Sequence, residues 1–152
     1  MEAPARIEPR GLADYLEVLS KAVFQPGMSW QVVAAKWPGI KEALHSFDPA
    51  KLADLTPPDL DALMADKRLI RNRRKLEAIV ANAGQMLDLE RAHGSFGDYL
   101  RSGGSFDATV ADLRARFRFL GEMGAYYFLH VVGEPVPSYD EWCAAHHQAP
   151  RH

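Results

Sequence analysis

The chain has 152 residues, of which 47% are hydrophobic and 25% charged, and its net charge is −2. That length predicts one domain over residues 1–152 with its own core, flexible at residues 1–10 and 147–152. No apolar run approaches the roughly 20 residues that span a bilayer, and the N-terminus lacks a signal peptide's apolar core. The single cysteine, Cys143, excludes an internal disulfide. We therefore expect a monomeric cytoplasmic protein that does not associate with membranes.

Charge is distributed unevenly along the chain. Residues 48–66 contain five aspartates and one lysine, whereas residues 67–75 contain six basic side chains. A second basic stretch places Arg114, Arg116 and Arg118 at alternate positions. Such polarised charge can steer a polyanion although the total is near zero, but a solvated helix face would look the same.

Helix signals dominate the chain from end to end. Apolar periodicity, capping residues and prolines locate the predicted helices. The first three cover residues 12–24, 30–37 after the N-cap Ser29, and 38–47 from Pro38, and two more are predicted to start at Asp48-Pro49 and at Thr56-Pro57. The remaining predicted helices cover residues 72–91, 96–101, 106–117, 125–132 and 138–146. The helix over 125–132 is apolar on nearly all sides and is expected to be buried. No convincing period-two strand is present, so the sequence predicts a compact all-α domain.

Three segments resemble the DNA-3-methyladenine glycosylase I family, within the helix-hairpin-helix DNA glycosylases. They are FQPGMSW (24–30), LIRNRRKLEAIVANA (69–83) and FRFLGEMGAYYFLHVVG (117–133), and they occur in the family's order. The resemblance implies a helical helix-hairpin-helix glycosylase-like fold. It also implies base excision repair of alkylated purines such as 3-methyladenine, by base flipping and hydrolysis of the N-glycosidic bond in double-stranded DNA, without a cofactor.

The hairpin segment is the candidate phosphate site. Gly121 lies where backbone N–H groups and a helix N-terminus can approach an anion, and Arg116 and Arg118 flank it. The family often has a second glycine two residues later, where this chain has Met123, and we expect Gly124 to compensate. Arg71 and Arg73 in the preceding basic run are further candidates for phosphate contacts, although some of that run should pair with the aspartates before it.

The first segment is the candidate base pocket. An enzyme that extracts a base must fill the gap left in the stack, and the resemblance assigns that wedge to Met28. It places Trp30 against the flipped base, where an aromatic face suits a cationic alkylpurine. Gln25 and Tyr126 are further candidates for base contact. A core position is the alternative interpretation for Trp30 and the preferred one for Trp37.

The chain also departs from the family. The family's base-recognising glutamate falls at Ala22, and its zinc ligands are not matched, so we predict no metal. Asp140 matches in spacing the catalytic aspartate of the wider superfamily, and a carboxylate there could stabilise an oxocarbenium ion or orient water. A helix cap is the alternative for Asp140. No lysine follows the hairpin, which argues against a lyase step and favours a monofunctional enzyme.

Three hypotheses about function remain. The first is a monofunctional glycosylase that acts on alkylated purines through Trp30, Gly121 and Asp140. The second is a non-catalytic DNA-damage-binding or structural module on the same fold, which the alanine at position 22 favours. The third is a protein-interaction domain that has lost DNA binding, which the acidic net charge would suit. Salt-dependent affinity for duplex DNA separates the third from the other two.

Overall fold

The computed structural model describes residues 5–26 and 29–147. Within these residues the regular structure is helical, with no strand. The α-helices are α1 (Leu12–Phe24), α2 (Trp30–Ala43), α3 (Pro49–Ala53), α4 (Pro57–Met64), α5 (Arg73–His93), α6 (Phe96–Arg101), α7 (Phe106–Arg116), α8 (Glu122–Val131) and α9 (Tyr139–His147). The predicted all-α class is confirmed.

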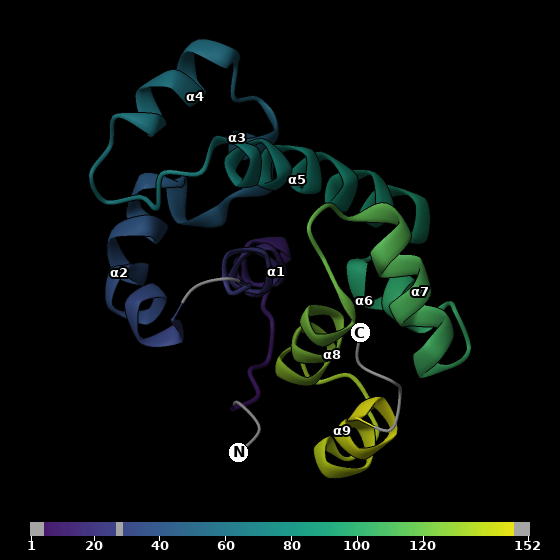
Figure 1. Ribbon diagram of the computed structural model, residues 1–152. Helices are drawn as coiled ribbons and strands as arrows, with labels where there is room; N and C mark the ends of the chain where they lie inside the picture. The colour runs from purple at the N-terminus through teal and green to yellow at the C-terminus, as the bar shows by residue number, and fades with distance from the viewer. Residues whose placement is uncertain (1–4, 27–28, 148–152) are drawn as a thin grey trace.

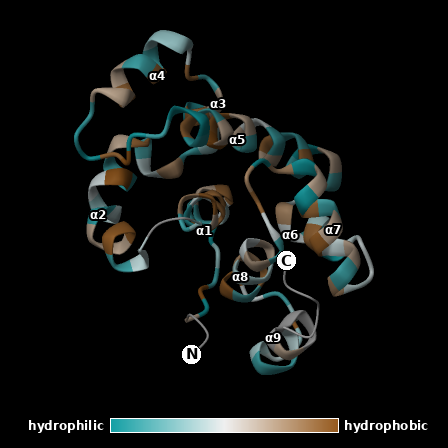
Figure 2. Cartoon of the chain, viewed as in Figure 1, coloured by the Kyte–Doolittle hydropathy of each residue, from teal (hydrophilic) through white to brown (hydrophobic). Residues whose placement is uncertain are grey.

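The core is built around α1, which is seen end-on in Figure 1 between α2, α5 and α8. Leu16 and Leu19 of α1 and Phe128 of α8 have no exposed surface, and each such burial stabilises the fold by about 1.5–3 kcal/mol. Hydrophilic and hydrophobic residues follow one another along α5 (Figure 2), and buried Leu76, Ile79, Ala83 and Met86 recur at helical steps, so one side of α5 faces this core. None of the described helices combines the length and apolar character needed to cross a membrane.

The predicted helix break at Pro38 is wrong. A single helix, α2, runs from Trp30 to Ala43 through the proline. Val33, Trp37 and Ile40 follow one another at helical steps and are all buried, so one apolar face continues across position 38. Proline costs a helix interior about 3 kcal/mol, and the packing of this continuous face offsets that cost.

The predicted caps at Asp48 and Thr56 form, whereas Ser29 occupies the predicted N-cap position of α2 without a side-chain hydrogen bond to that helix. Asp48 accepts a hydrogen bond from Ala50 N at 3.0 Å, and Asp59 accepts one from Thr56 N at 2.9 Å. Asn72 accepts from Lys75 N at 3.1 Å and so starts α5 inside the basic run. This cap fixes which residues of the run occupy the first turn of α5, and those residues build the site described next.

Candidate nucleic-acid interface

The hairpin between α7 and α8, residues 117–121, is attached to α5 by one buried amide. Asn82 is 2% exposed, and its Oδ1 accepts a hydrogen bond from Arg118 N at 2.8 Å while its Nδ2 donates to Arg118 O at 3.3 Å. Gly121 then forms the N-cap of α8, with φ −91°, and a Cβ added there would meet nothing within 4 Å. The hairpin therefore leaves the backbone at the start of α8 open, as a phosphate contact requires.

The first turn of α5 connects this hairpin to the segment before α2. Lys75 Nζ donates to Pro26 O at 3.1 Å and to Phe24 O at 3.5 Å, and burial lowers the pKa of Lys75. The neighbouring Arg74 guanidinium lies 5.7 Å from the ring centroid of Phe119 in the hairpin. The three segments that carry the family resemblance therefore meet at the start of α5.

Helices α1 and α8 approach closely where Ala22 faces Gly124. A Cβ added at Gly124 would lie 3.4 Å from the Ala22 Cβ and 3.0 Å from the Leu120 Cδ1. Gly124 therefore permits the contact between the two helices, and its predicted part in DNA binding stays a prediction. Ala22 is 1% exposed, so a buried methyl group lies at the position where the resemblance would put the family's glutamate.

The two tryptophans of α2 have different environments. Trp37 is buried, stacks on Phe47 with ring centroids 5.3 Å apart, and donates from Nε1 to Glu17 Oε2 at 2.9 Å. Trp30 is the first residue of α2 and is 40% exposed, so it is not a core residue. Gln25, at the end of α1, is half-buried next to the Pro26 carbonyl that Lys75 binds.

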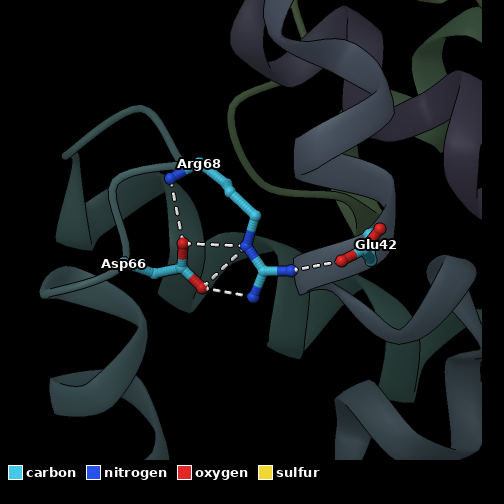
Figure 3. Close-up of polar contacts among 3 residues, drawn as sticks. All are labelled: Glu42, Asp66 and Arg68. Carbon is cyan, nitrogen blue, oxygen red and sulfur yellow. Dashed lines mark hydrogen bonds and ion pairs between the residues drawn. The ribbon is translucent and has the colours of Figure 1, made fainter.

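Part of the basic run is neutralised by carboxylates, as the sequence indicated. Arg68 binds Asp66 at 2.6 Å and reaches Glu42 of α2 at 2.8 Å, as Figure 3 shows. Hydrogen bonds from the Arg68 side chain are the largest cause that lowers the pKa of Asp66 to about 2. Arg73, a predicted phosphate contact, pairs with Asp61. The ion pair competes with phosphate for that guanidinium.

The other predicted arginines divide in the same way. Arg116 Nε lies 2.8 Å from Asp112 Oδ2, one helical turn earlier on α7. Arg71 and Arg118 have exposed side chains and form no ion pair with any described residue. Of the four predicted phosphate-binding arginines, these two have no carboxylate partner in the described part of the chain; one lies beside α5 and one in the hairpin.

The side chain of Tyr126, on α8, packs against α9. Its hydroxyl donates to Pro137 O at 2.7 Å, and its ring stacks on Trp142 with centroids 4.6 Å apart. The side chain is 3% exposed. These contacts occupy the ring that the sequence assigned to base binding, and that role stays a prediction.

Asp140 lies exposed in the first turn of α9. Ser138 Oγ accepts a hydrogen bond from Glu141 N at 3.1 Å and so caps the start of this helix. In the view of Figure 1, α1 and α8 lie between α9 and α2, the helix that carries Trp30. The catalytic role of Asp140 stays a prediction.

Two predictions concern groups that the structure does not describe. One is the wedge role of Met28, which lies outside the described residues. The other is the absence of zinc, because the side chains of Cys143, His146 and His147 are also outside the description. Among the described side chains, no group of three or more His, Cys, Asp or Glu residues is placed to hold a metal ion. The predicted absence of zinc is left as a prediction.

Three contributors to this interface were missed from the sequence: Asn82, Arg74 and Phe119. Asn82 is a polar residue on the buried side of α5, next to Ala83, and that position was the only available signal. The contact between Arg74 and Phe119 joins residues far apart in the chain, and no local pattern predicts it.

The chain matches known proteins over most of its length. The family model described as methyladenine glycosylase matches residues 10–115. DNA-3-methyladenine glycosylase of Haemophilus influenzae is 35% identical over 130 residues, covering 72% of this chain and 70% of that protein. DNA-3-methyladenine glycosylase 1 of Escherichia coli is 29% identical with the same coverage.

The fold agrees with the same relationship. A solved structure of 3-methyladenine DNA glycosylase I from Staphylococcus aureus, described as showing the basis of 3-methyladenine recognition, superposes with a TM-score of 0.73. It is 27% identical to this chain, and the match covers 84% of this chain and 79% of that one. The predicted glycosylase-like helical fold is thereby confirmed. The chain belongs to the methyladenine glycosylase family.

Proposed function

We propose that this protein is a monofunctional DNA glycosylase that releases alkylated purines, such as 3-methyladenine, from double-stranded DNA. The observation that carries the proposal is the meeting of three segments at the start of α5. Lys75 binds the carbonyl of Pro26 before α2, Arg74 contacts Phe119, and Asn82 fixes Arg118 in the hairpin. The segments that meet there carry an exposed tryptophan, two arginines without an ion pair among the described residues, and an open helix N-terminus.

In our proposal, each group of residues at this interface has its own role. Arg71, Arg118 and the backbone at Gly121 bind phosphates, which gives affinity without sequence preference. Trp30 stacks on the base once it has left the helix, and a cationic alkylpurine favours that contact. In our proposal the protein is a monomer and acts on DNA in the cytoplasm.

The chemical step needs a carboxylate, and the position of the family's base-recognising glutamate holds only the buried methyl of Ala22. We assign the role to Asp140. When the C1′–N bond breaks, its electron pair leaves with the cationic purine, which becomes a neutral base. The carboxylate stabilises the positive charge that develops on the sugar, orients the water that attacks C1′ and accepts the proton that this water loses. Ala125, Tyr126 and Tyr127 occupy the part of α8 where a Schiff-base lysine would be expected, so the proposal includes no lyase step.

The test is release of free methylated base from alkylated duplex DNA by the wild type and by Asp140→Asn. Glu141→Gln is the matched control, because it removes the adjacent exposed carboxylate of the same helical turn. We expect release by the wild type and by Glu141→Gln and a loss of at least about 100-fold for Asp140→Asn.

Other outcomes would contradict separate parts of the proposal. Release that survives in Asp140→Asn would mean that another group supplies the carboxylate. Absence of release with salt-sensitive DNA binding intact would establish the non-catalytic damage-binding module. Absence of DNA binding would favour the protein-interaction hypothesis.

A further inference from the structure

Phe119 is a large apolar side chain on the surface of the hairpin. It is 45% exposed, although phenylalanine is among the residues most often buried. Phe117 and Leu120, on either side of it in the same hairpin, are 3% and 7% exposed. Two apolar side chains of the hairpin are therefore buried, and the ring of Phe119 is exposed to solvent.

The backbone of Phe119 is strained. Its φ is +59°, in the left-handed region that non-glycine residues rarely adopt and that costs of order 1 kcal/mol or more. Glycine would adopt it freely. Because Asn82 holds the preceding residue by both backbone polar groups, the conformation is imposed by the surrounding structure. Strained backbone is often found at ligand-binding positions, and here it coincides with an exposed aromatic ring.

Arg74 supplies a charge at the same place. Its guanidinium lies 5.7 Å from the Phe119 ring centroid and forms no ion pair with a described residue. The residues on either side of it are engaged, since Arg73 pairs with Asp61 and Lys75 binds backbone carbonyls. Arg74 therefore combines an available positive charge with an aromatic face.

We propose that Phe119 and Arg74 form a second aromatic DNA-contacting element, in addition to Trp30 and next to the phosphate site at Arg118 and Gly121. The ring packs against the sugar and base edge of a strand in the minor groove, and the guanidinium binds the neighbouring phosphate. Apolar side chains that enter the minor groove and arginines that bind phosphate are both common in DNA recognition. This inference rests on the proposed function, because it takes duplex DNA as the ligand.

The decisive variant is Phe119→Gly, which removes the ring and also relieves the left-handed strain. We expect its thermal unfolding midpoint to equal or exceed that of the wild type. Its Kd for an undamaged duplex should rise about tenfold, which corresponds to a loss of about 1.4 kcal/mol. The dependence of affinity on salt should stay unchanged, because no charge has been removed.

Arg74→Gln gives the complementary result. We expect weaker binding and a salt slope smaller by about 0.9, the value for one lost phosphate contact. The controls are Ile7→Ala, an exposed apolar side chain whose backbone is held by the far end of α8, and Arg91→Gln at the other end of α5. Both controls should bind within about twofold of the wild type.

The outcomes separate this inference from the proposed function. A wild type that binds duplex DNA while Phe119→Gly and Arg74→Gln bind equally well would overturn the second contact element alone. A wild type that binds no duplex would overturn the proposed function and this inference with it. Weaker binding by the controls as well would show a general effect of surface substitution and would also contradict the inference.

Discussion

Asn82 of α5 holds both backbone polar groups of Arg118, a residue 36 positions further along the chain. A buried side chain of α5 therefore holds the hairpin that precedes α8. An unsatisfied buried polar group costs about 1–3 kcal/mol, so the buried Asn82 amide needs hydrogen-bond partners, and the hairpin backbone supplies them.

Asn82→Ala should loosen the hairpin without removing any group that touches DNA. We expect the DNA concentration for half-maximal base release to rise, while the maximal rate changes less, because phosphate binding is impaired and the chemical groups remain. The free energy of unfolding should fall by about 1–3 kcal/mol. Gln85→Ala, a half-buried position one turn later on α5, is the control. An unchanged half-saturating DNA concentration in Asn82→Ala would contradict a positioning role.

Trp30→Ala tests the base pocket. Because Trp30 is 40% exposed, its removal should leave the unfolding midpoint nearly unchanged. The preference for methylated over intact DNA should fall about five- to thirtyfold, the equivalent of a lost stacking and cation–π contact of about 1–2 kcal/mol. Val32→Ala, a neighbouring side chain 45% exposed, serves as control in the same competition assay. A preference that survives in Trp30→Ala would remove this residue from the pocket.

Much of the helical frame is predictable from local signals, because a cap and a proline act over a few residues. Ser95 and Ser105 both accept the N-terminal hydrogen bond of their helices, and the predicted bounds of α6 agree with the structure. Pro38 shows the limit of this reasoning, since burial of Trp37 and Ile40 outweighs a local break signal.

The interface was predictable only in part. The motifs identify the segments that meet, but which charges stay available depends on contacts between helices. Arg73 and Arg116 are paired, whereas Arg74 forms no ion pair with the residues that the structure describes, and all three look alike in the sequence. Tyr126 and Tyr127 are adjacent on α8, yet the first packs on α9 while the second lies near Glu17 of α1, so only the helix's rotation distinguishes them.

Two helical glycines should respond oppositely to alanine. In Gly124→Ala the new Cβ would lie 3.0 Å from Leu120 Cδ1, and because Leu120 is itself buried, the variant should lose about 1–3 kcal/mol of stability. In Gly84→Ala the Cβ meets nothing within 4 Å, and α5 should gain about 0.5–1 kcal/mol. Urea unfolding of both variants measures the difference. Equal effects of the two substitutions would mean that α1 and α8 do not depend on Gly124 for their approach.

The ion pair between Asp66 and Arg68 predicts an acid-dependent part of the stability. The pKa of Asp66 is about 2 in the folded protein, below its usual 3.8. Because the folded value is the lower one, the carboxylate favours folding above about pH 4, and this contribution disappears as the pH falls through about 2. Asp66→Asn should therefore lose less stability than the wild type over that window, as urea midpoints would show. Asp54→Asn, which removes an exposed carboxylate without an ion pair among the described residues, should follow the wild type.

Gly121→Asp separates folding from DNA binding at the hairpin. A side chain fits there, because the added Cβ meets nothing within 4 Å and φ is −91°. Aspartate is also a better N-cap than glycine and its charge suits a helix N-terminus, so α8 should be as stable as before or slightly more so.

The same charge should repel the phosphate that the hairpin is proposed to bind, and the affinity for all duplexes should fall. Gly121→Asn keeps the shape and the capping ability without the charge, and should bind DNA more tightly than Gly121→Asp. The measurement is fluorescence anisotropy with damaged and intact duplexes at two salt concentrations. If Gly121→Asp and Gly121→Asn bind equally well at low salt, where electrostatic repulsion is strongest, no phosphate lies at the start of α8.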